Sequence, residues 1–105
     1  MSDQNLGEFE QIVLLAVLRL GEGAYGVPIR YEIEKRGGRN VTIGALYSTL
    51  DRLEAKGCLT SWFADPTGER GGRSRRYFRV QPHGLEALAR AKDILDRMWN
   101  GVRLA

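Results

Sequence analysis

The feature of this sequence that most restricts its fold is a change in the spacing of apolar residues near residue 58. Before that point apolar residues recur every three or four positions, as the buried side of a helix requires. After it, "LTSWFA" (59–64) and "RYFRV" (76–80) alternate, as strands with one buried face do. Helical spacing returns from Pro82. The order predicts helices on either side of a β-hairpin.

The first part of the chain predicts three helices. The first covers about residues 7–20 and is apolar on nearly every side, so we expect it to bury one face in its own core and another against a second surface. Pro28 suits the first turn of a second helix, which Gly37 and Gly38 end. Thr42 is a good N-cap for a third.

The third helix has two distinct faces. Its inward stripe is Ile43, Leu46, Leu50 and Leu53. Its opposite face carries small and polar residues, namely Gly44, Ala45, Ser48, Thr49 and Arg52. Small side chains at the start of a helix permit close approach to a nucleic-acid groove, and hydroxyls such as those of Thr42 and Tyr47 can donate to phosphate.

The hairpin joins two strands through a loop rich in glycine and arginine. Its predicted inward pairs are Leu59 with Phe63 and Phe78 with Val80. Five arginines lie in or beside the loop: Arg70, Arg73, Arg75, Arg76 and Arg79. Guanidinium groups match phosphate geometry, so the loop predicts a phosphate-binding wing.

From Pro82 a helix of about five turns is predicted. Its apolar stripe is Leu85, Leu88, Ala91, Leu95, Met98 and Val102. The globular part ends near Val80 and is too small to cover this stripe, and monomers seldom expose such a patch. We therefore expect a homodimer. Its predicted interface comprises Leu14, Leu88, Leu95, Met98, Trp99 and Val102.

Composition limits the alternatives. A chain of 105 residues with 43% hydrophobic and 28% charged residues is a folded single domain, and its net charge is only +3. Five arginines are concentrated at residues 70–79, and for a polyanionic partner this local concentration matters more than the net charge. The lone Cys58 excludes an internal disulfide, and the longest apolar run (12–18) is short for a membrane span. We expect a cytoplasmic protein without a cofactor or metal.

Two hypotheses of enzyme activity have little support in the sequence. "GEGAYG" (21–26) matches the glycine pattern of dinucleotide-binding folds, but the apolar run before it has helical rather than strand spacing. His83 is the sole histidine, and no pattern brings it near Cys58 for nucleophilic catalysis. The helix order with a hairpin after the third helix instead predicts an α+β, mainly α, winged helix-turn-helix domain over residues 1–81, with a dimerisation helix over 82–105.

Three motifs give a resemblance. "IGALYSTLDRLEAKGCL" (43–59), "ERGGRSRRYFRVQPHGLEAL" (69–88) and "AYG" (24–26) are similar to the PadR family of bacterial transcriptional regulators. The resemblance implies a dimeric repressor that binds a palindromic operator in double-stranded DNA. In this sequence the implied and predicted DNA contacts are Thr42, Gly44, Ala45, Tyr47, Ser48, Arg52, Arg70, Arg73 and Arg75.

The resemblance also bears on the last helix. Some members bind flat aromatic effectors between the paired last helices, stacked on a tryptophan. Trp99 stands in about that place, although a tryptophan in the dimer core is the favoured interpretation. Two positions depart from the family: Gln81 replaces a frequent Thr cap, and "GVPI" (26–29) replaces an aromatic-acidic pair, so no second-helix contacts are carried over. A protein-binding adaptor with the same fold is the alternative function.

Overall fold

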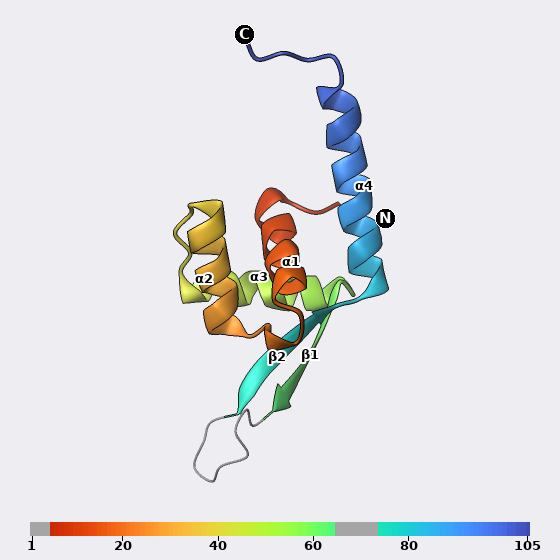
Figure 1. Cartoon of the computed structure of the whole chain (residues 1–105). Coiled ribbons are helices and arrows are strands. Elements are labelled where there is room, and N and C mark those ends of the chain that lie inside the picture. Colours follow the sequence, from red (N-terminus) through yellow and green to blue (C-terminus); the bar gives the residue numbers. More distant parts are fainter. Residues whose placement is uncertain (1–4, 65–73) are drawn as a thin grey trace.

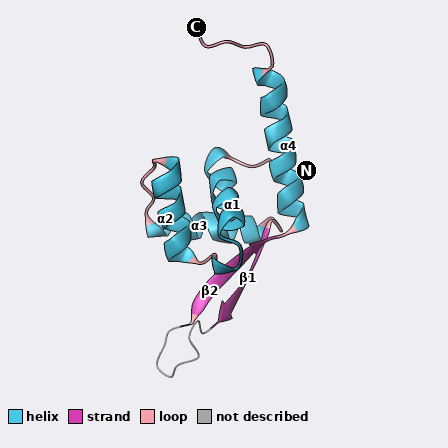
Figure 2. Ribbon diagram, viewed as in Figure 1, coloured by secondary structure: helices cyan, strands magenta, loops and turns pink. Residues whose placement is uncertain are grey.

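The computed structural model describes residues 5–64 and 74–105, which form four α-helices, one short 3-10 helix and two strands (Figures 1 and 2). Their order is α1 (Glu8–Leu20), η1 (Gly21–Gly23), α2 (Gly26–Gly37), α3 (Ile43–Ala55), β1 (Leu59–Ala64), β2 (Arg75–Val80) and α4 (Pro82–Trp99). The winged helix-turn-helix arrangement predicted from the sequence is confirmed.

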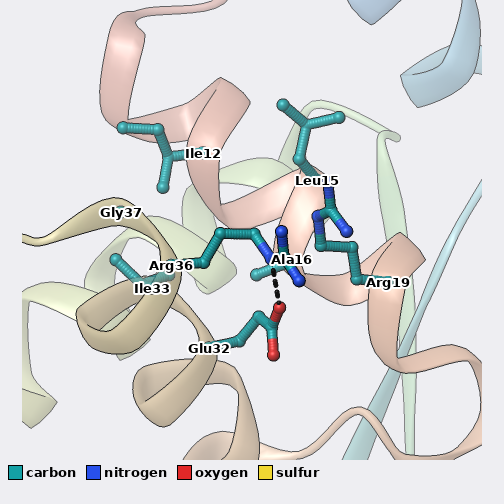
Figure 3. A pocket seen from close by; sticks show the side chains of 8 residues that line it. All are labelled: Ile12, Leu15, Ala16, Arg19, Glu32, Ile33, Arg36 and Gly37. Atoms are coloured by element: carbon teal, nitrogen blue, oxygen red, sulfur yellow. Dashed lines mark hydrogen bonds and ion pairs between the residues drawn. The ribbon is translucent and has the colours of Figure 1, made fainter.

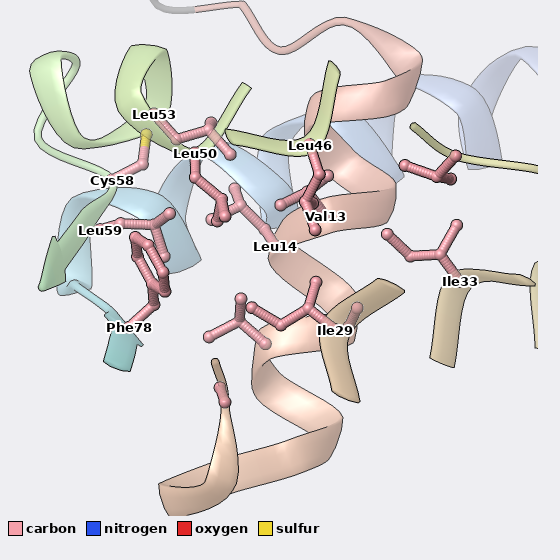
Figure 4. Close-up of a cluster of buried hydrophobic side chains, with 14 residues drawn as sticks. Val13, Leu14, Ile29, Ile33, Leu46, Leu50, Leu53, Cys58, Leu59 and Phe78 are labelled. Atoms are coloured by element: carbon pink, nitrogen blue, oxygen red, sulfur yellow. The ribbon is translucent and has the colours of Figure 1, made fainter. Parts of the chain in front are cut away.

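The first three helices enclose a core that β2 closes from one side. Figure 4 shows α1 running through the middle of this core. The largest fully buried side chains are Phe78, Leu14, Ile29, Leu46, Leu50, Leu53, Val13 and Cys58. Removal of these apolar surfaces from water is the main favourable term in folding.

The helix ends follow from local sequence. The Thr42 hydroxyl accepts a hydrogen bond from the Ala45 N–H at 3.1 Å, which confirms it as the N-cap of α3. Gly38 adopts the left-handed conformation (φ 64°) after α2, where a glycine is favoured because it has no Cβ. α4 starts at Pro82 without a side-chain cap from Gln81, so that residue is the poor cap expected.

The two strands pair antiparallel, with Leu59 opposite Val80 and Ala64 opposite Arg75. A third strand is reduced to a single bridge between Tyr25 and Tyr77, beside which the Phe78 N–H donates to the Ala24 carbonyl at 2.9 Å. The hairpin is therefore attached to the turn between η1 and α2 by backbone hydrogen bonding.

For three residues the predicted orientation of the side chain was wrong. Phe63 is 70% exposed rather than inward, because Arg76, which lies opposite it on β2, is the residue that contacts α3 at this level, through Asp51 and Glu54. Ile43 is largely exposed because it lies at the first turn of α3, at the edge of the core. Thr49 is buried instead of outward, and its hydroxyl accepts a hydrogen bond from Arg52 at 3.3 Å.

Helix α4 packs on the domain only at its base. Gly84 and Ala87 are its buried residues, and every residue from Lys92 onward is exposed as the helix projects away (Figure 1). The helix ends at Trp99, so Val102 lies beyond it instead of on its stripe. Within residues 5–64 and 74–105, no helix has the length and hydropathy needed to cross a bilayer.

The base of α4 depends on a glycine. A Cβ at Gly84 would lie 2.5 Å from the Cys58 carbonyl oxygen and 3.0 Å from a Val80 methyl group. A backbone carbonyl cannot rotate away as a side-chain tip can. Only glycine therefore lets α4 approach the start of β1 this closely.

We predict that Gly84→Ala lowers the free energy of unfolding by about 1–3 kcal/mol, as overpacking does. Gly44→Ala is the matched control, because a Cβ there meets nothing within 4 Å. Alanine should favour the α3 helix by about 0.5–1 kcal/mol. Urea denaturation of both variants measures these effects, and equal stability of the two would contradict the packing assigned to Gly84.

Candidate nucleic-acid interface

The outer side of the first turns of α3 is open. Thr42, Gly44, Ala45 and Ser48 are all exposed, and no atom lies within 4 Å of the place where a Gly44 Cβ would be. The structure therefore brings these four predicted contacts together on one accessible surface. Their small side chains let another molecule approach the helix backbone.

Tyr47 lies beside this surface but points into the domain. Its ring packs on Phe78 with centroids 6.4 Å apart, and a Cβ at Gly26 would overlap its hydroxyl. The close approach of Tyr47 explains why a glycine is needed at the start of α2. It also directs the hydroxyl toward α2, so its predicted donation to phosphate stays a prediction.

Arg52, at the far end of α3, is held by a carboxylate from α1. Its Nε donates to Glu10 at 3.1 Å, and Lys56 donates to the same carboxylate at 2.9 Å. Burial alone raises the pKa of Glu10, but hydrogen bonds from the Gly7 N–H and from Lys56 and Arg52 outweigh it, so its pKa is lowered. This cluster could not be predicted from the sequence, because Arg52 and Lys56 are 42 and 46 residues from Glu10.

A second ion cluster joins α3 to the hairpin. Arg76 donates to Asp51 at 2.9 Å and to Glu54 at 2.7 Å, and Ser61 donates to Glu54 at 2.8 Å. Burial acts to lower the pKa of Arg76, but its bonds to Asp51 and Glu54 prevail and raise it. The pairing neutralises Arg76 and fixes the base of the wing against α3.

Of the remaining predicted contacts in the wing, the structure describes Arg75. Arg70 and Arg73 lie outside the described residues. Arg75 is exposed, and its guanidinium carbon lies 4.4 Å from the centroid of the Tyr25 ring. Within residues 5–64 and 74–105 it has no ion-pair partner, so its charge is available to a polyanion.

Comparison with known proteins gives a consistent answer. Residues 14–90 match the model of the "Transcriptional regulator PadR-like family". The chain belongs to the PadR-like family of transcriptional regulators. It is 36% identical over 74 residues to transcriptional regulator Rv3488 of Mycobacterium tuberculosis, an alignment that covers 70% of this chain and 64% of that protein. This chain thus spans slightly less than two thirds of that relative.

Solved structures agree on the fold. A transcriptional regulator from Clostridium thermocellum superposes with a TM-score of 0.71 at 22% identity, covering 87% of this chain and 85% of the other. A PadR-family regulator from Eggerthella lenta gives 0.69 at 26% identity, covering 90% and 81%. The winged-helix fold of the PadR-like family is therefore shown for this chain.

This PadR-like chain has a second exposed surface, a groove of about 610 Å³ between α1 and α4. Its apolar lining is Leu15, Leu18, Leu85, Leu88, Ala89, Leu95 and Trp99. The prediction that Leu14 lies in the dimer interface was wrong, because its side chain is fully buried in the core of the domain. Leu15, 49% exposed, and Leu18 are the leucines of α1 that face the groove.

A smaller cleft of about 210 Å³ lies between α1 and α2 (Figure 3). Ile12, Ala16 and Ile33 contribute to its apolar lining, and Arg36 is paired with Glu32 at 2.9 Å beside it. None of the predicted contacts of α3 lines this cleft.

Three observations of the described residues bear on the two enzyme hypotheses. The segment before "GEGAYG" is helix α1 rather than a strand, so the strand–turn–helix context of a dinucleotide site is missing from this region. Burial raises the pKa of the Cys58 thiol, which opposes formation of a nucleophilic thiolate. Among the described residues no group of His, Cys, Asp and Glu is arranged to hold a metal ion.

We predict that Glu10→Gln lowers stability at pH 7 by about 1–3 kcal/mol, since it removes hydrogen bonds to a charged group. Because the pKa of Glu10 is lowered on folding, its contribution is complete above the unfolded pKa and is lost as pH falls through the folded pKa. The difference in unfolding free energy between the wild type and Glu10→Gln should thus be constant above about pH 5 and shrink below it. Glu8→Gln, at an exposed position, is the control. A difference that persists unchanged at pH 3 in urea denaturation would disprove the linkage.

Proposed function

We propose that this protein is a sequence-specific DNA-binding regulator that acts as a homodimer, as a repressor on a palindromic operator. The observation that carries the proposal is the open first turn of α3 beside an arginine-bearing wing. Helix α3 then enters the major groove and the wing follows the adjacent backbone. In a bacterial cell this places the protein in the cytoplasm, with the DNA.

The contacts divide by kind. Thr42, Gly44, Ala45 and Ser48 have the exposure that groove binding needs, and Ser48 is the candidate for reading a base edge. Arg75 binds phosphate. Arg70 and Arg73 are assigned the same role from the sequence alone. Arg52 keeps Nη1 free of hydrogen bonds within the described residues, so it can reach phosphate without leaving Glu10.

The groove between α1 and α4 supports the proposed dimer. Met98 and Trp99, with leucines on both helices, expose apolar surface that a second copy covers symmetrically. A palindromic site requires two copies of α3 about 34 Å apart, one turn of DNA, and we propose that a two-fold axis at the groove places them so. Val102 remains part of the proposed interface, from beyond the helix end.

The same groove is our proposed place for a flat aromatic effector. Trp99 lines it and is 52% exposed in one protomer, which leaves a ring face for stacking. An aromatic ligand there would compete with or extend the dimer packing of Trp99.

Salt-dependent gel shifts on the promoter of the protein's own gene test the DNA proposal. Binding should weaken steeply as salt rises, in proportion to the phosphates neutralised. Absent or salt-insensitive binding would favour the alternative, a winged-helix adaptor for another protein.

Arg75→Ala and Ser48→Ala should have different effects. Loss of a phosphate contact weakens binding to all sequences and reduces the salt slope by about one. Loss of a base contact instead changes the preference at one position in each half-site, by about 1–3 kcal/mol. Competition assays with operator variants measure both; the same loss on operator and random DNA for both variants would refute this division.

Trp99→Asp should break the dimer and abolish operator binding, because a carboxylate cannot be buried unpaired in an apolar interface. Its winged domain should stay folded, since Trp99 is on the projecting end of α4. Arg90→Gln, which changes the net charge by the same one unit at an exposed residue of α4 outside the groove lining, is the control for charge. Sedimentation of the wild type as a monomer at micromolar concentration, or of the Trp99 variant as a dimer, would rule out the interface.

A further inference from the structure

Five side chains form a continuous stack on the face of the hairpin turned away from α3. In order they are Arg79, Trp62, Tyr77, Tyr25 and Arg75, here called the aromatic stack. Trp62 and Tyr77 are nearly parallel, with centroids 6.0 Å apart and planes inclined by 20°. Tyr77 and Tyr25 follow in a tilted contact, with centroids 5.4 Å apart and planes inclined by 59°. An arginine lies over a ring at each end, 5.2 Å from Trp62 and 4.4 Å from Tyr25.

The stack joins two parts of the fold. Trp62, Tyr77 and both arginines belong to the hairpin, whereas Tyr25 is the residue before α2. Backbone pairing of Tyr25 with Tyr77 brings the two parts into contact. This backbone pairing fixes the hairpin to the helix-turn-helix unit, and the Tyr25 ring contacts Tyr77 and Arg75. The Tyr25 side chain gives no cap to α2.

We propose that the aromatic stack holds Arg75 ready for a DNA phosphate, which makes Tyr25 a positioning residue for DNA binding. The inference rests on the proposed function. A guanidinium that stacks by its face keeps its N–H donors at the edge, where they can bind phosphate in the plane of the group. Ordering this long side chain in advance removes an entropic cost that binding would otherwise carry.

The neighbouring arginine shows why the stack matters. Arg76 points to the other face of the hairpin, where Asp51 and Glu54 order and neutralise it. Arg75 has no carboxylate within ion-pair distance among the described residues, so stacking orders it while its charge stays available. The same segment thus carries one arginine for structure and one for a polyanion.

A double-mutant cycle tests the inference. Tyr25→Ala should weaken operator binding between about threefold and thirtyfold, the range of a cation–π contact. Tyr25→Phe keeps the ring and should bind as the wild type does. In an Arg75→Ala background, Tyr25→Ala should have almost no further effect, because Tyr25 acts through Arg75. Tyr31→Ala, which removes an exposed tyrosine of α2 under Lys35, is the matched control and should leave binding unchanged.

A second measurement needs no DNA. Relaxation of the Arg75 Nε–H group by NMR should show an ordered side chain in the wild type and in Tyr25→Phe, and a mobile one in Tyr25→Ala with its helices intact. Additive losses in the cycle, or an Arg75 equally mobile in all three proteins, would overturn the positioning role. Absence of DNA binding by the wild type, with Arg75 still ordered, would instead remove the proposed function and with it the role of the stack in binding.

Discussion

Burial of α1 from several sides is the constraint on which the rest of the structure depends. Val13, Leu14 and Val17 fill the core between α2, α3 and β2. Glu10, near the start of the same helix, holds the far end of α3 through Arg52. The remaining side carries leucines that line the groove with α4. A helix apolar all round would be poorly soluble alone, so its neighbours are required and their positions are fixed by it.

Charge pairing within the domain decides which cations remain for a partner. Glu10 engages Arg52 and Lys56, and Asp51 with Glu54 engages Arg76. These pairs give little net charge to the surface where they lie, so the formal count of arginines overstates the positive field. Arg75 is different because aromatic rings, which bear no charge, hold it in place. What a nucleic acid meets depends on this distribution more than on the net charge.

The sequence predicted most of the fold because the relevant signals are local. Periodicity, Thr42 as a cap and Pro28 in a first turn depend on residues within a few positions, and each was confirmed. Errors arose where the third dimension decides. Leu14 and Leu15 are adjacent in an apolar run, and only packing shows that the first enters the core while the second faces the groove. The open face of α3 was visible from its small residues, but the aromatic stack was not, since Tyr25 meets Tyr77 only through long-range pairing.

The projecting part of α4 is the structural feature that most favours the proposed dimer. The projecting turns, residues 92–99, are too short to be stable in water as an isolated helix. They also gain nothing from the core, because they do not touch it. Their apolar residues would cost free energy in solvent, yet Lys92 and Asp96 form an i,i+4 pair that supports a helix here. A helix stabilised locally, and apolar where it leaves its own domain, suits a surface that is completed by association. The groove is the continuation of that surface on α1, and covering both together buries far more apolar area than either alone.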